Sequence, residues 1–60
     1  MMLVAAPVQD YMRAVGWKIE GSQAFPPTTE AARIMQFYGV IGPVGADGSA
    51  AILRPMLILV

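Results

Sequence analysis

The side chains that could carry out chemistry in this sequence are four carboxylates, a single lysine and the hydroxyls of Ser22 and Ser49. General acid–base catalysis needs two titratable groups close together with separated pKa values. Asp10 and Glu30 stand where helices are expected to begin, and Asp47 stands in a turn. These carboxylates therefore have structural explanations, and we assign none of them to catalysis.

Nucleophilic and metal chemistry lack the residue types that they require. The sequence holds no cysteine and no histidine, so a serine nucleophile has no imidazole base. The usual ligand sets for zinc and haem are missing for the same reason. Lys18 follows Trp17 and is expected at the surface, not in the apolar pocket of a Schiff-base lysine. The sequence predicts a protein that is not an enzyme and that binds no cofactor or metal ion.

The composition favours association with other protein chains. Sixty residues allow one small domain, over residues 1–60, and a chain of this size buries only about 60% of the surface that its unfolded form exposes. Apolar residues make up 57% of the sequence and charged residues 13%, against about 25% charged in ordinary domains. So few charges leave apolar surface that the chain itself cannot cover. Docking or oligomerisation is the common way left to stabilise such a scaffold.

Neither nucleic acid nor a membrane suits the sequence. Phosphate binding needs clustered basic side chains, whereas the four basic residues here match four acidic ones and stand singly. A membrane-spanning helix needs about 20 mostly apolar residues, and the apolar runs 1–8 and 56–60 are much shorter. We expect protein partner chains, in a homo-oligomer or a hetero-oligomer, with no nucleic acid and no transmembrane span.

A first helix is expected over residues 7–15. Its apolar residues recur at i, i+3, i+4 and i+7, which is the pattern of one helical face. Pro7 suits the first turn, because its missing N–H would have no partner there, and Gly16 suits the C-terminal stop. The face consists of Val8, Tyr11, Met12 and Val15.

A second helix is expected over residues 29–38. Thr28 or Thr29 supplies the N-cap, and Gly39 ends the helix. Its predicted buried face consists of Ala31, Ile34, Met35 and Tyr38.

The remaining segments predict short strands and turns. Residues 17–20 alternate, with Trp17 and Ile19 on the buried side of a strand, and residues 21–27 read as a loop that contains two prolines. Asp47-Gly48 marks a turn that joins two apolar arms, with an edge strand or a bulge at Pro55. The predicted fold is α+β: two short helices plus a C-terminal β-hairpin that reaches the end of the chain, completed by partner or oligomer contacts.

Candidate contact residues lie near the C-terminus and at two aromatic positions. The run 57–60 does not alternate, and a continuous apolar run is typical of a strand buried on both faces. We expect segment 56–60 or segment 1–6 to add to the sheet edge of a partner. Trp17 and Phe25 are the candidate anchors, although Trp17 is also expected on a buried face. The predicted interface residues are Trp17, Phe25, Met56, Leu57, Ile58, Leu59 and Val60.

The sequence favours a structural or accessory subunit of a larger protein assembly that acts by docking on partner chains. Its most concrete form is a phage virion protein that cements or decorates a capsid, located in the virion or in the host cytoplasm. The alternative is a small soluble binding module or an inhibitor of a host enzyme. That alternative needs a self-sufficient fold with a polar binding face, and the low charge count disfavours it.

Overall fold

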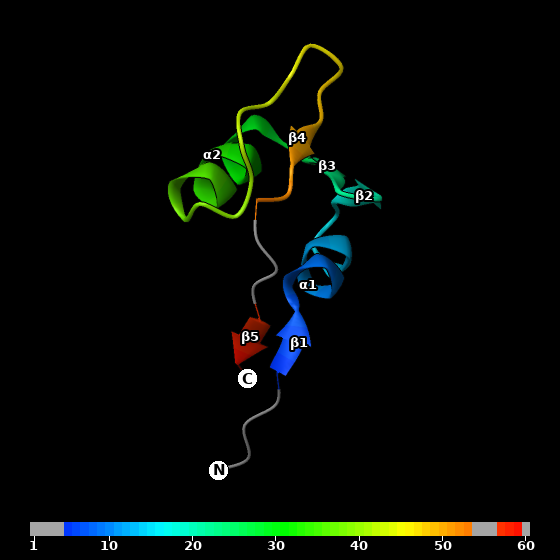
Figure 1. Ribbon diagram of the computed structural model, residues 1–60, viewed down its shortest axis with the longest axis vertical. Coiled ribbons are helices and arrows are strands. Elements are labelled where there is room, and N and C mark those ends of the chain that lie inside the picture. Colours follow the sequence, from blue (N-terminus) through cyan, green and yellow to red (C-terminus); the bar gives the residue numbers. More distant parts are fainter. Residues whose placement is uncertain (1–4, 54–56, 60) are drawn as a thin grey trace.

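The computed structural model describes residues 5–53 and 57–59, and for residues 5–7 and 57–59 it describes the backbone. The elements along the chain are β1 (Ala5–Pro7), α1 (Val8–Ala14), β2 (Lys18–Glu20), β3 (Gln23–Phe25), α2 (Thr29–Phe37), β4 (Ala50–Ala51) and β5 (Leu57–Leu59). Both predicted helices and the strand predicted at 17–20 are present (Figure 1), and the α+β class is confirmed. Completion of the fold by partner contacts stays a prediction.

The strands form two antiparallel sheets. One has three strands in the order β2-β3-β4, and the other pairs β1 with β5. In Figure 1 the β1–β5 pair lies at one end of the molecule, and β4 lies toward the other end. The chain passes from β1 directly into α1, so the small sheet and the first helix are joined without a loop.

Both helices end in the same way, with a glycine at positive φ that closes a Schellman motif. At the end of α1, Gly16 has a φ of 102°, and the N–H of Trp17 donates to the carbonyl of Met12 at 2.9 Å. At the end of α2, Gly39 has a φ of 71°, and the N–H of Val40 donates to the carbonyl of Met35, also at 2.9 Å. The residue after each glycine then turns into the core, where Trp17 and Val40 are both buried.

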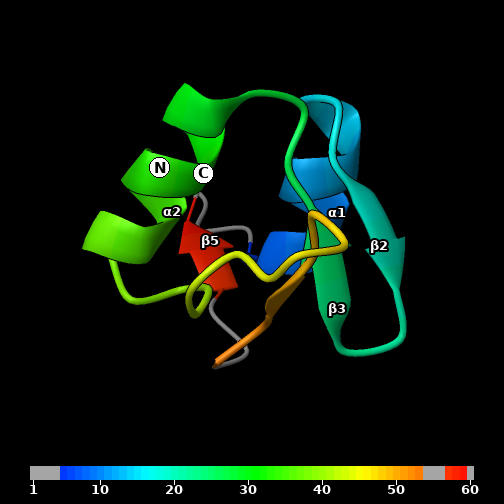
Figure 2. The same cartoon turned by 90° about the horizontal axis from the view of Figure 1, so that it is seen from above.

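A small hydrophobic core holds these elements together. In Figure 2, α2 lies on one side, and α1 with the β2–β3 hairpin lies on the other. Each of these elements contributes buried side chains, and Met12 of α1 is fully buried. Partly buried hydrophobic residues, Met35 of α2 among them, pack against the cluster. The buried hydrophobic residues are Val8, Met12, Trp17, Ala24, Ala32, Val40, Ile41 and Ala50.

The prediction of a loop over residues 21–27 is wrong, because this segment contains the strand β3. Glu20 pairs with Gln23 across a two-residue turn, and Gly21 opens that turn with a φ of 59°. A glycine with positive φ at the first turn position is the requirement of a type II′ hairpin turn. Ala24 then pairs with both neighbouring strands and is fully buried, so β3 is the central strand of the sheet.

The turn predicted at Asp47-Gly48 is present. Gly48 has a φ of 87°, and its N–H donates to the carbonyl of Gly45 at 3.0 Å. The N–H of Gly45 donates in turn to the carbonyl of Ser49 at 2.8 Å. These bonds close the loop that leads into β4.

The prediction that the second strand of the C-terminal hairpin runs to the end of the chain is wrong. After the turn, β4 pairs with β3, and it meets the first arm at an isolated bridge between Ile41 and Ile52. The C-terminal strand β5 pairs with β1, with Ala5 opposite Leu59. In the sequence Pro55 stands between β4 and β5, and a proline has no N–H to donate to a strand ladder.

Candidate docking surface

The two aromatic residues predicted as anchors are largely covered by this chain. Trp17 belongs to the core and is 4% exposed. Phe25 is half-buried, and its ring lies 5.6 Å from the Nζ of Lys18, which sits opposite it on β2. The same Nζ lies 3.1 Å from Oε1 of Glu20. Trp17 therefore packs within the molecule, and part of Phe25 lies under a lysine of the same hairpin.

The C-terminal residues predicted at the interface are placed in part. The backbone of β5 pairs antiparallel with β1, so each predicted docking strand already uses one edge for the other. Met56 and Val60 lie outside the described residues, as do residues 1–4. The expectation that segment 56–60 or segment 1–6 adds to a partner sheet stays a prediction.

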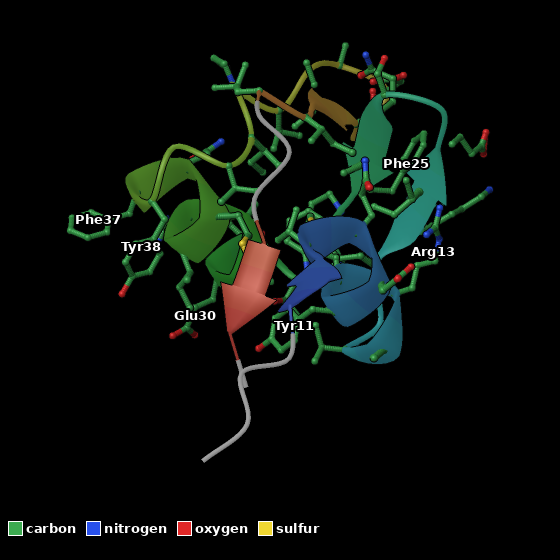
Figure 3. The ribbon with its side chains drawn as sticks, turned by 60° about the horizontal axis from the view of Figure 1, so that its bottom comes forward. Tyr11, Arg13, Phe25, Glu30, Phe37 and Tyr38 are labelled. Carbon is green, nitrogen blue, oxygen red and sulfur yellow. The ribbon has the colours of Figure 1, made fainter. Side chains whose placement is uncertain are left out.

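The outward side of α2 gathers large exposed side chains. Phe37 is 83% exposed, Tyr38 59% and Ile34 47%. At 100° per residue these positions lie on the side of the helix opposite Ala32, which is the residue of α2 that is buried in the core. Figure 3 shows Phe37 projecting away from the rest of the molecule.

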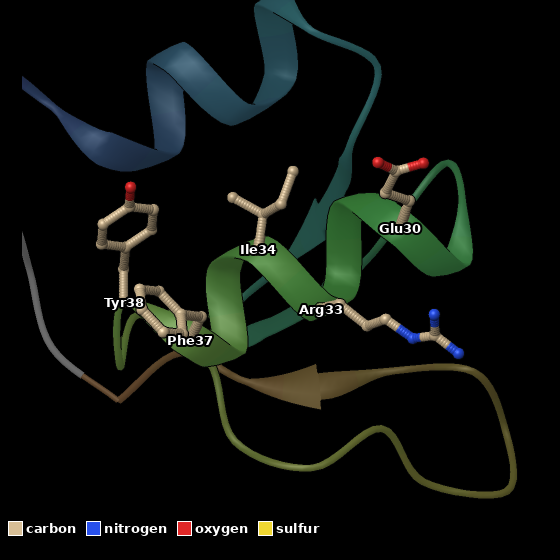
Figure 4. A pocket seen from close by; sticks show the side chains of 5 residues that line it. All are labelled: Glu30, Arg33, Ile34, Phe37 and Tyr38. Carbon is tan, nitrogen blue, oxygen red and sulfur yellow. The ribbon is translucent and has the colours of Figure 1, made fainter.

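A shallow depression of about 630 Å³ runs along this outer face. Figure 4 shows Glu30, Ile34 and Tyr38 rising from one side of α2, while Arg33 and Phe37 project from the adjacent side. The Phe37 and Tyr38 rings meet edge to face, with centroids 5.2 Å apart, an arrangement that holds both rings in place. We call these five residues the outer face of α2.

A second groove, of about 390 Å³, lies between the two helices and continues this surface. It is lined by Tyr11 of α1, by Val15 just after that helix, and by Ile34 and Met35 of α2. Tyr11 is 45% exposed and Val15 47%. Ile34 lines both depressions, so the outer face of α2 adjoins the groove between the helices at this residue.

The sequence missed this surface because it placed the same residues in the core. Tyr11 and Tyr38 were expected on buried faces, and the structure leaves about half of each exposed. On α2 the structure buries Ala32 and exposes Ile34, while Ala31 and Met35 of the expected stripe are partly buried and pack against the core. One signal could have located the surface: Phe37 lies off the predicted stripe, and a large aromatic residue there has to face outward.

A polar cluster lies at the turn before β4. Ser49 is buried, and its Oγ donates to Oδ1 of Asp47 at 2.8 Å; the N–H of Ser49 donates to the same oxygen at 3.0 Å. These two hydrogen bonds, the backbone one first, lower the pKa of Asp47 below its ordinary value. The cluster closes its own turn, so we assign it a structural role.

The described residues bring together no metal site and form no membrane-spanning helix. Within residues 5–53 and 57–59, no three His, Cys, Asp or Glu side chains come together in a way that could hold a metal ion. The same part of the chain has no helix with the length and apolarity needed to cross a membrane. Comparison of the chain with protein-family models, with curated proteins and with solved structures found no match. Function is therefore inferred from the surface that the chain presents.

Proposed function

We propose that this chain is a structural or accessory subunit of a larger protein assembly, and that it docks on a partner chain through the outer face of α2. The observation that carries the proposal is Phe37, an aromatic side chain that is 83% exposed on a helix whose opposite side is in the core. Contiguous exposed apolar patches on small proteins commonly mark sites of protein association.

The residue types on this face are those found at the centre of protein interfaces. Aromatic residues and arginine are enriched there, and tyrosine and arginine are frequent among residues that dominate binding energy. The outer face combines Arg33, Phe37 and Tyr38 along little more than one helical turn. Ile34 adds an aliphatic centre to this group, so the patch has both an apolar middle and side chains that define an orientation.

The edge of the three-stranded sheet is a poorer docking site. β2 is an edge strand, and its outward side chains are Lys18 and Glu20, which pair with each other at 3.1 Å. Charged side chains on an edge strand discourage the addition of another strand. This edge therefore provides a matched control for experiments on α2.

Site-specific photo-crosslinking tests the proposal. A photoreactive phenylalanine analogue replaces Phe37 in one variant and Glu20 in the other, and both are expressed in cells that make this protein. Because both positions are exposed, neither replacement disturbs the core. We expect the variant at position 37 to form a covalent adduct with a polypeptide on illumination, and the variant at position 20 to remain uncrosslinked.

The mass of the adduct decides between kinds of partner. An adduct of twice the chain mass contains a second copy, and a heavier adduct contains a different polypeptide; either result supports docking through α2. Equal crosslinking at positions 20 and 37, or none at 37, would overturn the proposal. The virion location is the most concrete form of the proposal, and adducts with a capsid protein would establish it.

A further inference from the structure

We propose that the partner on the outer face of α2 is a second copy of this chain, packed so that the two α2 helices run antiparallel about a two-fold axis near Ile34. This inference rests on the proposed function, and it names the occupant of that surface. A two-fold interface uses the same patch on both copies, so the patch has to be complementary to itself.

Charge is the first reason for a second copy. The chain has a net charge of zero, so two copies approach each other without overall repulsion. The outer face carries one negative residue, Glu30, and one positive residue, Arg33. Parallel helices would set Glu30 against Glu30 and Arg33 against Arg33. In an antiparallel pair the two Glu30 side chains lie apart along the helix axis, and so do the two Arg33 side chains. The weaker repulsion between like charges favours the antiparallel arrangement.

The spacing of the side chains is the second reason. In an antiparallel pair with its axis at position 34, position 33 of one helix lies opposite position 35 of the other, and Phe37 of the partner lies about 3 Å further along the axis at 1.5 Å per residue. The long side chain of Arg33 spans that offset to reach the exposed Phe37 of the partner, and an arginine over an aromatic ring is favourable. Ile34 faces Ile34 across the axis. The exposed side chains at the centre of the patch thereby make two kinds of favourable contact, arginine with an aromatic ring and isoleucine with isoleucine.

The available area is the third reason. A stable interface takes roughly 800 Å² from each partner, which is about a fifth of the 4193 Å² that this chain exposes. The outer face of α2 does not end at that helix, because the groove lined by Tyr11 and Val15 continues it. A second copy therefore finds contact area on both helices, with the aromatic residues of α2 at the centre.

Single cysteines test this geometry cleanly, because the sequence contains no cysteine of its own. Helices packed about 8–10 Å apart place the Cα atoms facing each other at the two-fold axis about 4–5 Å apart, given a Cα radius of about 2.3 Å. That separation suits a disulfide. The two Glu30 positions lie roughly 12 Å apart along the axis at 1.5 Å per residue, which is too far.

We therefore expect Ile34→Cys to form a disulfide-linked dimer under mild oxidation, and Glu30→Cys to remain monomeric on a denaturing gel. Lys18→Cys, on the edge strand β2, serves as the control for random collision. All three positions are exposed, so the variants keep the fold. Crosslinking of Glu30→Cys at the same rate as Ile34→Cys would overturn the antiparallel arrangement.

Sedimentation of the unmodified chain tests the dimer itself. We expect a concentration-dependent mass that approaches twice 6.4 kDa, and Phe37→Ala should raise the dimer dissociation constant roughly 30-fold, as truncation of an interface hot spot does. A chain that stays at 6.4 kDa at millimolar concentration would overturn the second-copy inference. Photo-crosslinking of position 37 to a different polypeptide would then still uphold the proposed function, so the two failures are distinguishable.

Discussion

The two helices of this protein end alike and bury different kinds of residue. Each closes with a glycine at positive φ, Gly16 or Gly39, followed by a backbone hydrogen bond of 2.9 Å that spans five residues. Yet α1, with seven residues, buries Val8 and Met12. The longer α2 buries one alanine. The ends of a helix are therefore determined by local residues, whereas its buried face depends on what packs against it.

The difference assigns separate tasks to the helices. α1 is held by the core, through a methionine that is fully buried. α2 reaches the core through Ala32 and through the partly buried Ala31 and Met35, and turns its aromatic residues outward. A helix that leaves Phe37 outside while burying alanine is better suited to binding than to stabilising its own domain. Substitutions on each helix test this contrast.

The largest effect is expected for Met12→Ala. Removal of a large buried side chain costs about 2–5 kcal/mol, and a domain of this size has a total stability of roughly 3–9 kcal/mol at 0.05–0.15 kcal/mol per residue. We expect the free energy of unfolding, measured in urea, to fall by a large part of its value.

Phe37→Ala is the matched variant on α2. Because Phe37 is 83% exposed, its loss should change the free energy of unfolding of the monomer by less than about 0.5 kcal/mol. The measurement is made at protein concentrations low enough for the chain to be monomeric. If Phe37→Ala destabilised the monomer as much as Met12→Ala, the outer face of α2 would belong to the core and the contrast between the helices would be wrong.

The sequence predicts the helices well because their signals are local. Threonine before α2 and glycine after each helix act within a few residues, and both helices begin and end within one residue of the predicted bounds. The strand β3 was missed because Pro26 and Pro27 dominate its surroundings, although Gly21-Ser22 is a recognised hairpin turn. The pairing of β5 with β1 joins opposite ends of the chain, and no local pattern specifies such a partner.

The glycines that end the helices provide the next test. An alanine forced into the left-handed region costs roughly 1–2 kcal/mol, so Gly39→Ala and Gly16→Ala should each lower the free energy of unfolding by about that amount. Gly16 has the larger φ, 102° against 71°, and we expect the larger loss there. Its added Cβ would meet Pro27 at an ordinary 3.5 Å, so the loss arises from the backbone.

Gly42→Ala is the control for the helix-end glycines. Gly42 is not among the glycines with positive φ, and a Cβ there would meet Leu53 at an ordinary contact distance of 3.5 Å. Alanine at such a position can stabilise a protein by about 0.4–1 kcal/mol, because it restricts the unfolded chain. A loss at Gly42 equal to that at Gly39 would show that the cost does not come from positive φ.

The exposed surface of α2 was less predictable than the helix ends, for a physical reason. The i, i+3, i+4 pattern shows that Ile34 and Tyr38 share a face of α2, and it cannot show whether that face meets this chain or another one. In the structure the neutral, small Ala32 takes the inward position, which lets the backbone of α2 lie close to the core. The large residues then remain outside. The assignment of this pattern to the core was therefore right for Ala31 and Met35, which pack against the core, and wrong for Ile34 and Tyr38, which are exposed.

The most local effect is expected at the beginning of α2, where Thr28 acts as the N-cap. Its Oγ1 accepts a hydrogen bond from the N–H of Ala31 at 3.0 Å, whereas α1 begins directly after Pro7, the last residue of β1. Thr28→Ala should cost about 1 kcal/mol and speed hydrogen exchange of the Ala31 amide, while Thr28→Ser should behave like the unmodified chain. Exchange in α1 should not change, because capping acts within one turn. Faster exchange in both helices would show that they unfold as one unit, and the separate tasks assigned to them would then lack an energetic basis.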